Sequence, residues 1–413
     1  MTAPRPSVTT LELLPAYGQS ENRPSRSAEA LAPLDAATTN QMYFTYGLVD
    51  ADGAMLGPAG AAIKAIDQQV PASGFMTAAA LGSVSPAYAF QYARAARWRD
   101  GGDVQRGAVI ADHGSGGRRI EEFQPDNPTP CGRNQIYWLR ESARLAASFG
   151  TGLHCPYVFA FIGTSAKTQS AADFRTAFNA AHAPLVAEVE ALTGTTPKLV
   201  MVMNGSDVRS IGDVYATPSA QYRLAMEHGA LMGTWQRIYP INDRNIHLDP
   251  QEKVLIGETC AWAAEIDEAG GPWNITYAVA KAGDTVTVSF DLRPGEVLLN
   301  RPDLYDAYGG PATCPNFGFE AEGGILAAIP DFGGNTVTLT LADPAASWLR
   351  FAHQLQDCMD MVDEQGYAMS AHRSTLFGSE TRPSRFVPGQ TLWRPLPGFR
   401  GTFSGDAFTA EGG

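Results

Sequence analysis

Three separate stretches of the sequence carry side chains suited to nucleophilic catalysis. The first contains Ser20, in AYGQSENRP, where Gly18 permits a tight turn. A serine in such a turn, directly after a parallel strand, is presented to a ligand at the edge of the sheet. Its hydroxyl is a weak nucleophile unless a neighbouring base takes the proton. Taken alone, Ser20 is more typical of an N-cap or turn residue, so the catalytic interpretation depends on partners elsewhere in the chain.

The second stretch is rich in glycine, and the third holds a histidine between two aspartates. Residues 114–123 read GSGGRRIEEF. Adjacent glycines let the backbone approach a ligand and leave N–H groups free to face a developing oxyanion. His247 follows Asp243 by four residues and precedes Asp249 by two, so it can be a general base held by a carboxylate. Taken singly, the two stretches are typical of a flexible loop and of a surface histidine.

The elements that must position these stretches follow an alternating pattern over residues 1–265. Short apolar runs predict strands, and apolar stripes at spacings of three and four predict helices. This alternation is typical of a parallel sheet with helices on both faces. The predicted strands are 9–14, 106–111, 157–162 and 198–203, and the predicted helices are 134–149, 173–192 (closed by Gly194) and 219–232.

The pattern changes near residue 265. Residues 284–292 and 335–341 alternate Thr or Ser with apolar residues, which predicts antiparallel strands with one buried face. We therefore expect a β-sandwich-like module over 266–345. Residues 346–413 are predicted to form a C-terminal helix and a Pro-rich strap over 378–401, packing on the rest.

In their order along the chain, the three catalytic stretches resemble the motifs of the SGNH (GDSL-like) hydrolases. The most similar branch holds the sialate O-acetylesterases and carbohydrate acetylesterases, whose blocks resemble GQSN, GGTxIEAW and DxIHPxxKQxxG. Here the corresponding residues are 18–21 (GQSE), 116–123 (GGRRIEEF) and 246–253 (IHLDPQEK). The resemblance covers about residues 9–260 and implies an SGNH-hydrolase-like (flavodoxin-like) α/β domain, often followed by a β-rich segment.

The resemblance also implies roles for individual residues. Ser20 would be the nucleophile, His247 the base and Asp243 the orienting carboxylate, with Asp249 as the alternative. The family aspartate usually stands three residues before the histidine, where this chain has Arg244. The third family block, typically QGES, corresponds to Ile162–Ala166 and has no amide side chain. The implied oxyanion donors are Ser20, Gly116 and either Thr164, Ser165 or Asn204, and the implied substrate contacts are Gln19, Glu21 (usually Asn) and Arg118.

These residues predict a serine esterase that removes O-acetyl groups from a carbohydrate through an acyl-enzyme, without metal or organic cofactor. The alternative is a carbohydrate-binding or structural component of a phage-like fibre or spike with a degenerate site. Homo-oligomeric or virion-like assembly is compatible with either function. The partner expected in either case is an acetylated carbohydrate.

The composition limits the other function classes. The 413 residues carry 30 Lys and Arg against 43 Asp and Glu, a formal net charge of −13, which disfavours binding to nucleic acid. The chain shows neither a signal peptide nor 18 consecutive apolar residues, so we expect no membrane insertion and a cytoplasmic or virion-associated protein. The five cysteines lack CxxC spacing and are predicted to be reduced and mostly buried.

Overall fold

One large sheet forms the centre of the N-terminal half. The structure is a computed structural model that describes residues 8–19, 22, 25–26, 42–46, 74–77, 83–114, 117–166, 169–204, 216–239, 241–242, 248, 250–303, 314–353, 361–362, 368–370 and 374–411. The strand order is β10-β9-β8-β1-β6-β3-β4; β4 is antiparallel to β3, the other neighbours are parallel, and β7 pairs with the first part of β1. The strands are β1 (Thr10–Gly18), β3 (Met42–Tyr46), β4 (Gly74–Thr77), β6 (Arg106–Gly114), β7 (Gly152–His154), β8 (Tyr157–Phe161), β9 (Lys198–Met203) and β10 (Leu231–Trp235).

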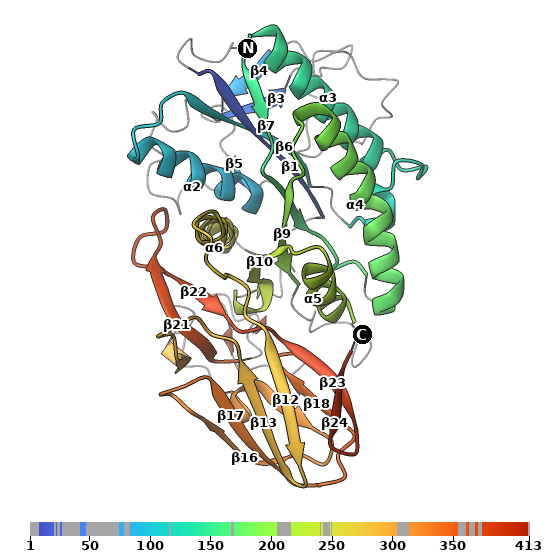
Figure 1. The fold of residues 1–413 in the computed structure, drawn as a ribbon, viewed down its shortest axis with the longest axis vertical. Helices are drawn as coiled ribbons and strands as arrows, with labels where there is room; N and C mark the ends of the chain where they lie inside the picture. The colour runs from blue at the N-terminus through green and yellow to red at the C-terminus, as the bar shows by residue number, and fades with distance from the viewer. Residues whose placement is uncertain are drawn as a thin grey trace.

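Helices cover both faces of this sheet, as Figure 1 shows. One face packs against α3 (Cys131–Ser148), α4 (Ala171–Thr193) and α5 (Thr217–Glu227), and the other against α2 (Pro86–Asp100) and α6 (Pro250–Glu268). Successive β1 residues alternate between the two cores: Leu13 and Tyr17 join the first, and Leu14 and Ala16 the second. Because both faces are buried, these strands are continuous apolar runs.

Most of the predicted elements of this half are confirmed. The predicted strands match β1, β6, β8 and β9, and the first two predicted helices match α3 and α4. α4 begins where the Ser170 hydroxyl accepts a hydrogen bond from Asp173 N at 3.1 Å, and it ends at Gly194, which has a φ of 67°. The predicted helix 219–232 is wrong at its end. α5 stops at Glu227, Gly229 turns the chain with a φ of 58°, and the apolar run that follows is β10.

A β-sandwich occupies the C-terminal half. Alternate side chains of β12 (Tyr277–Ala282), β13 (Thr285–Phe290), β17 (Thr336–Leu341) and β16 (Ile325–Pro330) face a second sheet of β15 (Phe319–Ala321), β18 (Trp348–Phe351), β23 (Phe399–Ser404) and β24 (Ala407–Ala410). Val288, Leu339 and Phe351 are among the fully buried residues between the sheets. The second sheet contains three strands beyond residue 345. The predicted module boundary there is therefore too early, because the first sheet needs them to bury its inner face.

The chain beyond residue 345 differs from the prediction in a second respect. Its described residues form strands, and the predicted C-terminal helix is not among them. The predicted strap is a regular hairpin of β21 (Leu376–Pro383) and β22 (Thr391–Pro395), which also pairs with β14 (Leu298–Asn300). Buried Phe386, Val387 and Leu392 pack this hairpin into the core shared with α2 and α6.

Smaller elements complete the description. They are the strands β2 (Ser25–Arg26), β5 (Ser83–Val84), β11 (Ile241–Asn242), β19 (Met361–Val362) and β20 (Ala368–Ser370), and the short helices η4 (Ile120–Phe123), η6 (Gln236–Ile238) and η8 (Pro315–Gly318).

Cys131, Cys155 and Cys260 are free and buried as predicted, whereas Cys314 forms a disulfide, so the expectation of thiols throughout is wrong. Within the described residues, no helix is both long and apolar enough to cross a bilayer.

Candidate functional site

The end of β1 lies at the point where the order in which strands are added to the sheet reverses. Gly18 pairs with Gly114 of β6 on one side and with Phe161 of β8 on the other. The chain runs from β1 to β3 on the β6 side of the sheet and later from β8 to β9 on the other side, so the connections leaving β1 and β8 diverge. In open α/β sheets, this reversal creates a crevice at the carboxyl ends of the strands, where ligands bind. We call the carboxyl ends of β1, β6, β8 and β9 the carboxyl edge.

Close backbone contact fixes the end of β1. A Cβ on Gly18 would collide with the carbonyl of Phe161, so only glycine allows β1 and β8 to approach this closely. Gln19 N donates to the same carbonyl at 3.3 Å, and Asn22 N donates to Gln19 O at 3.0 Å. The second bond is the one that closes a β-turn. These bonds therefore tie Asn22 to Gln19 and Gln19 to the end of β8.

The side chain of Gln19 ties this turn to the loop that follows β8. It is only 3% exposed, and its Oε1 accepts from Ser165 N at 3.0 Å and Gly163 N at 3.4 Å. A neutral acceptor shared by two backbone N–H groups fixes both loops without placing a charge at the edge. The structure thus gives Gln19 a positioning contact. A direct contact with substrate remains a prediction.

A second pair of amides joins the ends of β8 and β9. Gln221 of α5 donates through Nε2 to Ile162 O at 2.8 Å and to Asn204 Oδ1 at 3.1 Å, and its Oε1 accepts from Asn204 N at 2.7 Å. Both side chains are fully buried. Because Oδ1 of Asn204 is an acceptor here, Nδ2 is fixed on the other side of the carboxamide.

Asn204 and the loop after β8 lie next to each other. A Cβ on Gly163 would be 3.1 Å from Asn204 Nδ2, and Gly163 has a φ of 130°, which strains any other residue. Thr164 follows in a turn that Ala166 N closes onto Gly163 O at 2.9 Å. The structure therefore brings Gln19, Thr164 and Asn204, three of the predicted residues, to one part of the carboxyl edge.

Sequence reasoning did not find Gln221. The available signal was its place on the stripe formed by Thr217, Ala220, Gln221 and Leu224, all of them buried in α5. A polar side chain on the apolar face of a helix must find a hydrogen-bond partner inside the protein. The two partners come from strands β8 and β9, which the pattern within α5 does not reveal.

The loop after β6 is held by carboxylates. Arg118 donates to Glu122 Oε1 at 2.7 Å, and Arg119 N donates to Glu122 Oε2 at 2.8 Å. Although burial opposes ionisation, these bonds keep the pKa of Glu122 below its usual value. Glu121 accepts from Gln169 Nε2 at 2.7 Å, which links this loop to the segment after β8. Arg118 is thus paired with a carboxylate beside the carboxyl edge.

Several predicted residues lie outside the described residues: Ser20, Glu21, Gly116, Asp243, His247 and Asp249. Their described sequence neighbours are ordered parts of the same half. Gln19 and Asn22 flank the first pair, Gly114 ends β6, and Leu248 is buried in the core shared with α2 and α6 just before α6 begins at Pro250. Among the described residues, no group of three or more His, Cys, Asp or Glu side chains could hold a metal ion.

One buried titratable group lies directly beneath the edge. Tyr17, the residue before Gly18, contacts His182 of α4 with 3.1 Å between its hydroxyl and Nδ1. Burial, with a smaller contribution from His228, lowers the pKa of His182 to about 4. His182 is therefore neutral at pH 7 and adds no charge beneath the end of β1.

Comparison with known proteins shows that this fold is similar to that of an esterase. No family model and no curated protein matches the sequence. Among solved structures, a carbohydrate acetylesterase from Xanthomonas citri matches 94% of this chain and 80% of its own, with a TM-score of 0.58 and 18% identity. A protein of Arabidopsis thaliana and NanS match 62% and 65% of this chain, and 97% and 100% of their own, at TM-scores of 0.40 and 0.41 and identities of 15% and 9%. The chain is thus similar in fold to the Xanthomonas acetylesterase over nearly all of its length.

Proposed function

We propose that the protein is a serine esterase of the SGNH type that removes O-acetyl groups from a carbohydrate. The observation that carries the proposal is the fixed end of β1. Gly18 and Gln19 are locked against β8 at the reversal point of the sheet, and Ser20 is the next residue. A nucleophile must be held by its support to within a fraction of an ångström. The fold similarity to a carbohydrate acetylesterase supports the choice of substrate class.

In the proposed reaction, the Ser20 hydroxyl attacks the acetyl carbonyl while His247 takes its proton. Asp243 orients and stabilises the resulting imidazolium, with Asp249 as the alternative. Collapse of the tetrahedral intermediate breaks the bond to the sugar oxygen, which receives the proton from His247. Water, deprotonated by the same histidine, then attacks the acetyl-enzyme and releases acetate and free Ser20.

Backbone N–H groups of Ser20 and Gly116 are the proposed oxyanion donors, each worth about 2.7–4 kcal/mol in the transition state. Asn204 is the preferred third donor over Thr164. Its Oδ1 accepts from Gln221, so the carboxamide is held with Nδ2 toward Gly163 at the carboxyl edge. A donor already fixed by packing needs no reorganisation when the charge develops.

The test compares hydrolysis of p-nitrophenyl acetate and of an acetylated polysaccharide by the wild type and four variants. We expect Ser20→Ala and His247→Ala to lower kcat at least about a thousandfold. Ser148→Ala and His154→Ala are matched controls, because both residues are exposed and His154 lies at the opposite end of the sheet. Equal product release by the wild type and the Ser20 and His247 variants would refute the assignment.

A further inference from the structure

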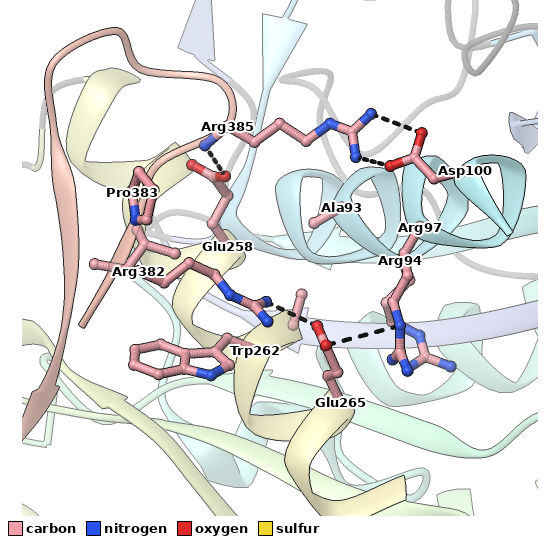
Figure 2. A pocket seen from close by; sticks show the side chains of 12 residues that line it. Ala93, Arg94, Arg97, Asp100, Glu258, Trp262, Glu265, Arg382, Pro383 and Arg385 are labelled. Carbon is pink, nitrogen blue, oxygen red and sulfur yellow. Dashed lines mark hydrogen bonds and ion pairs between the residues drawn. The ribbon is translucent and has the colours of Figure 1, made fainter. Parts of the chain in front are cut away.

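A cavity lies between the two halves, away from the carboxyl edge. Its volume is about 250 Å³, and α2, α6 and the β21–β22 hairpin line it. Figure 2 shows it from close by. The α2 residues in its wall belong to the end of the helix that leads into the start of β6, so the cavity lies toward the amino ends of the strands rather than at the carboxyl edge. We call it the joint pocket.

The wall of the joint pocket carries arginine side chains that are paired with neighbouring carboxylates. Arg385 makes a two-pronged ion pair with Asp100, and Arg382 donates to Glu265 at 2.7 Å. Figure 2 shows Arg382 and Arg97 approaching Glu265 from opposite sides. Because each of these cations already faces a carboxylate, the pocket has little net attraction for a simple anion.

Arg97 and Glu265 are close but not directly hydrogen-bonded, so a ligand atom between them needs particular hydrogen-bonding properties. Arg97 Nε lies 3.9 Å from Glu265 Oε1, too far for a hydrogen bond. An atom that bridges them would have to accept from the guanidinium and also donate to the carboxylate. The hydrogen bond from Arg382 holds the pKa of Glu265 below its usual value, so Glu265 remains an acceptor at neutral pH. A hydroxyl meets both requirements, whereas an anion without a proton meets only the first.

The remaining wall is apolar and limits the size of the occupant. Ala93, Ala261, Pro383 and Leu392 contribute carbon surface, and Trp262 lies under the Arg382 guanidinium, 5.5 Å from ring centroid to Cζ. The volume is slightly below the roughly 300–1,000 Å³ of sites for drug-sized ligands. It therefore suits one polyhydroxylated ring and excludes a longer chain from full burial.

From this geometry we propose that the joint pocket is a second, non-catalytic site for a single neutral sugar residue. One ring hydroxyl bridges Arg97 and Glu265, and the carbon face of the ring lies on the wall formed by Ala93 and Leu392. The β21–β22 hairpin supplies one wall and the helices the other, so a bound sugar contacts both halves of the molecule. The inference depends on the chemistry of the pocket and not on the proposed esterase activity.

The test measures binding of methyl glucoside, methyl galactoside and glucuronate to the full-length Ser20→Ala protein, by saturation-transfer NMR and calorimetry. We expect at least one neutral glycoside to bind. Ala93→Trp, which fills the pocket, should weaken that binding more than about tenfold, and Arg97→Ala, which removes a charged hydrogen bond, about tenfold. Arg140→Ala is the matched control, because Arg140 makes an exposed ion pair with Glu188 outside the pocket.

Three results would overturn the inference. In the first, no sugar binds, and the pocket holds water only. In the second, a sugar binds equally well to the Ser20→Ala protein and to the same protein carrying Ala93→Trp or Arg97→Ala, so it occupies another site. In the third, glucuronate alone binds, which identifies an anion site. Hydrolysis of p-nitrophenyl acetate should stay unchanged in Ala93→Trp, so failure of the esterase proposal and failure of this one are separate observations.

Discussion

The carboxyl edge and the joint pocket are both polar, but they are held together by different groups. At the edge, neutral amides and backbone atoms make the contacts: Gln19, Asn204 and Gln221 are buried and bonded largely to main chain. In the joint pocket, arginines face carboxylates, and several are nearly half exposed. Neutral donors around a buried edge suit a reaction in which charge appears only in the transition state. Exposed ion pairs suit a surface that exchanges water for a ligand.

The largest effect is expected at the edge, from Gln221→Leu. The change leaves Ile162 O, Asn204 N and Asn204 Oδ1 without their bonds to Gln221 in a buried place. We expect a loss of about 3 kcal/mol or more in unfolding free energy, measured by urea denaturation. If the amides position the oxyanion site, kcat falls about a hundredfold while KM changes little.

The matched control for that change is Gln91→Leu. Gln91 is also a fully buried helix glutamine, but it bonds to Glu12 near the other end of β1. It should lower stability without the loss of kcat. If both variants lose kcat in proportion to stability, the edge amides are only structural.

An intermediate effect is expected from pH. His182 is neutral in the folded state with a pKa of about 4, while the unfolded chain has a pKa near 6.5. The unfolded state therefore binds the proton more tightly between these values. Stability contributed by neutral His182 is present above pH 6.5 and is lost as the pH falls toward 4, up to about 3 kcal/mol.

Denaturant unfolding across this range should show that slope in the wild type and a flatter one in His182→Gln. His154→Gln, at an exposed position, is the control and should keep the wild-type slope. An unchanged slope in His182→Gln would place the acid sensitivity elsewhere. Because the amides of the edge do not titrate, a pH dependence of kcat that survives in His182→Gln belongs to the catalytic groups.

The smallest effect is expected in the joint pocket. Arg385→Ala removes an ion pair with Asp100 in which both side chains are about half exposed. The expected cost is at most about 1 kcal/mol of unfolding free energy, and it should shrink between 0.05 and 1 M NaCl because salt screens exposed pairs. A larger cost that salt does not change would show that the pair is effectively buried and that the contrast with the edge is wrong.

The elements that could be predicted are those in which apolar residues form either a continuous run or one regularly spaced stripe along the sequence. β8 and β9 are continuous apolar runs, and α4 carries one apolar stripe between two clear caps. α2 and α6 were missed because they bury polar side chains. Arg94, for example, is buried through bonds to Glu12 and Glu268, residues far away in the sequence. The hydropathy pattern of these helices does not indicate that their polar side chains are buried, because that burial depends on ion pairs and hydrogen bonds with residues distant in the sequence.

The same limit applies to the candidate site. The strand end at Gly18 could be read from local sequence, whereas the segment after β8 was assigned only through the family resemblance. The role of Gln221 depends on partners from β8 and β9, which no local pattern predicts. The assignments of Ser20, Gly116, Asp243 and His247 rest on the family resemblance and stay predictions, since they fall outside the described residues.

The hairpin near the C-terminus has a consequence for how the molecule comes apart. Phe386 packs edge-on against Tyr92 of α2, with ring centroids 4.6 Å apart, and Arg237 donates to the carbonyls of Ala352 and Leu396. The β21–β22 hairpin thus completes a core to which α2 contributes. We expect the two halves to melt in a single cooperative transition. A truncated α/β half would expose the apolar surface of α2 and α6 that packs against the β21–β22 hairpin, and we expect it to aggregate. The C-terminal half is therefore needed for the stability of the α/β half.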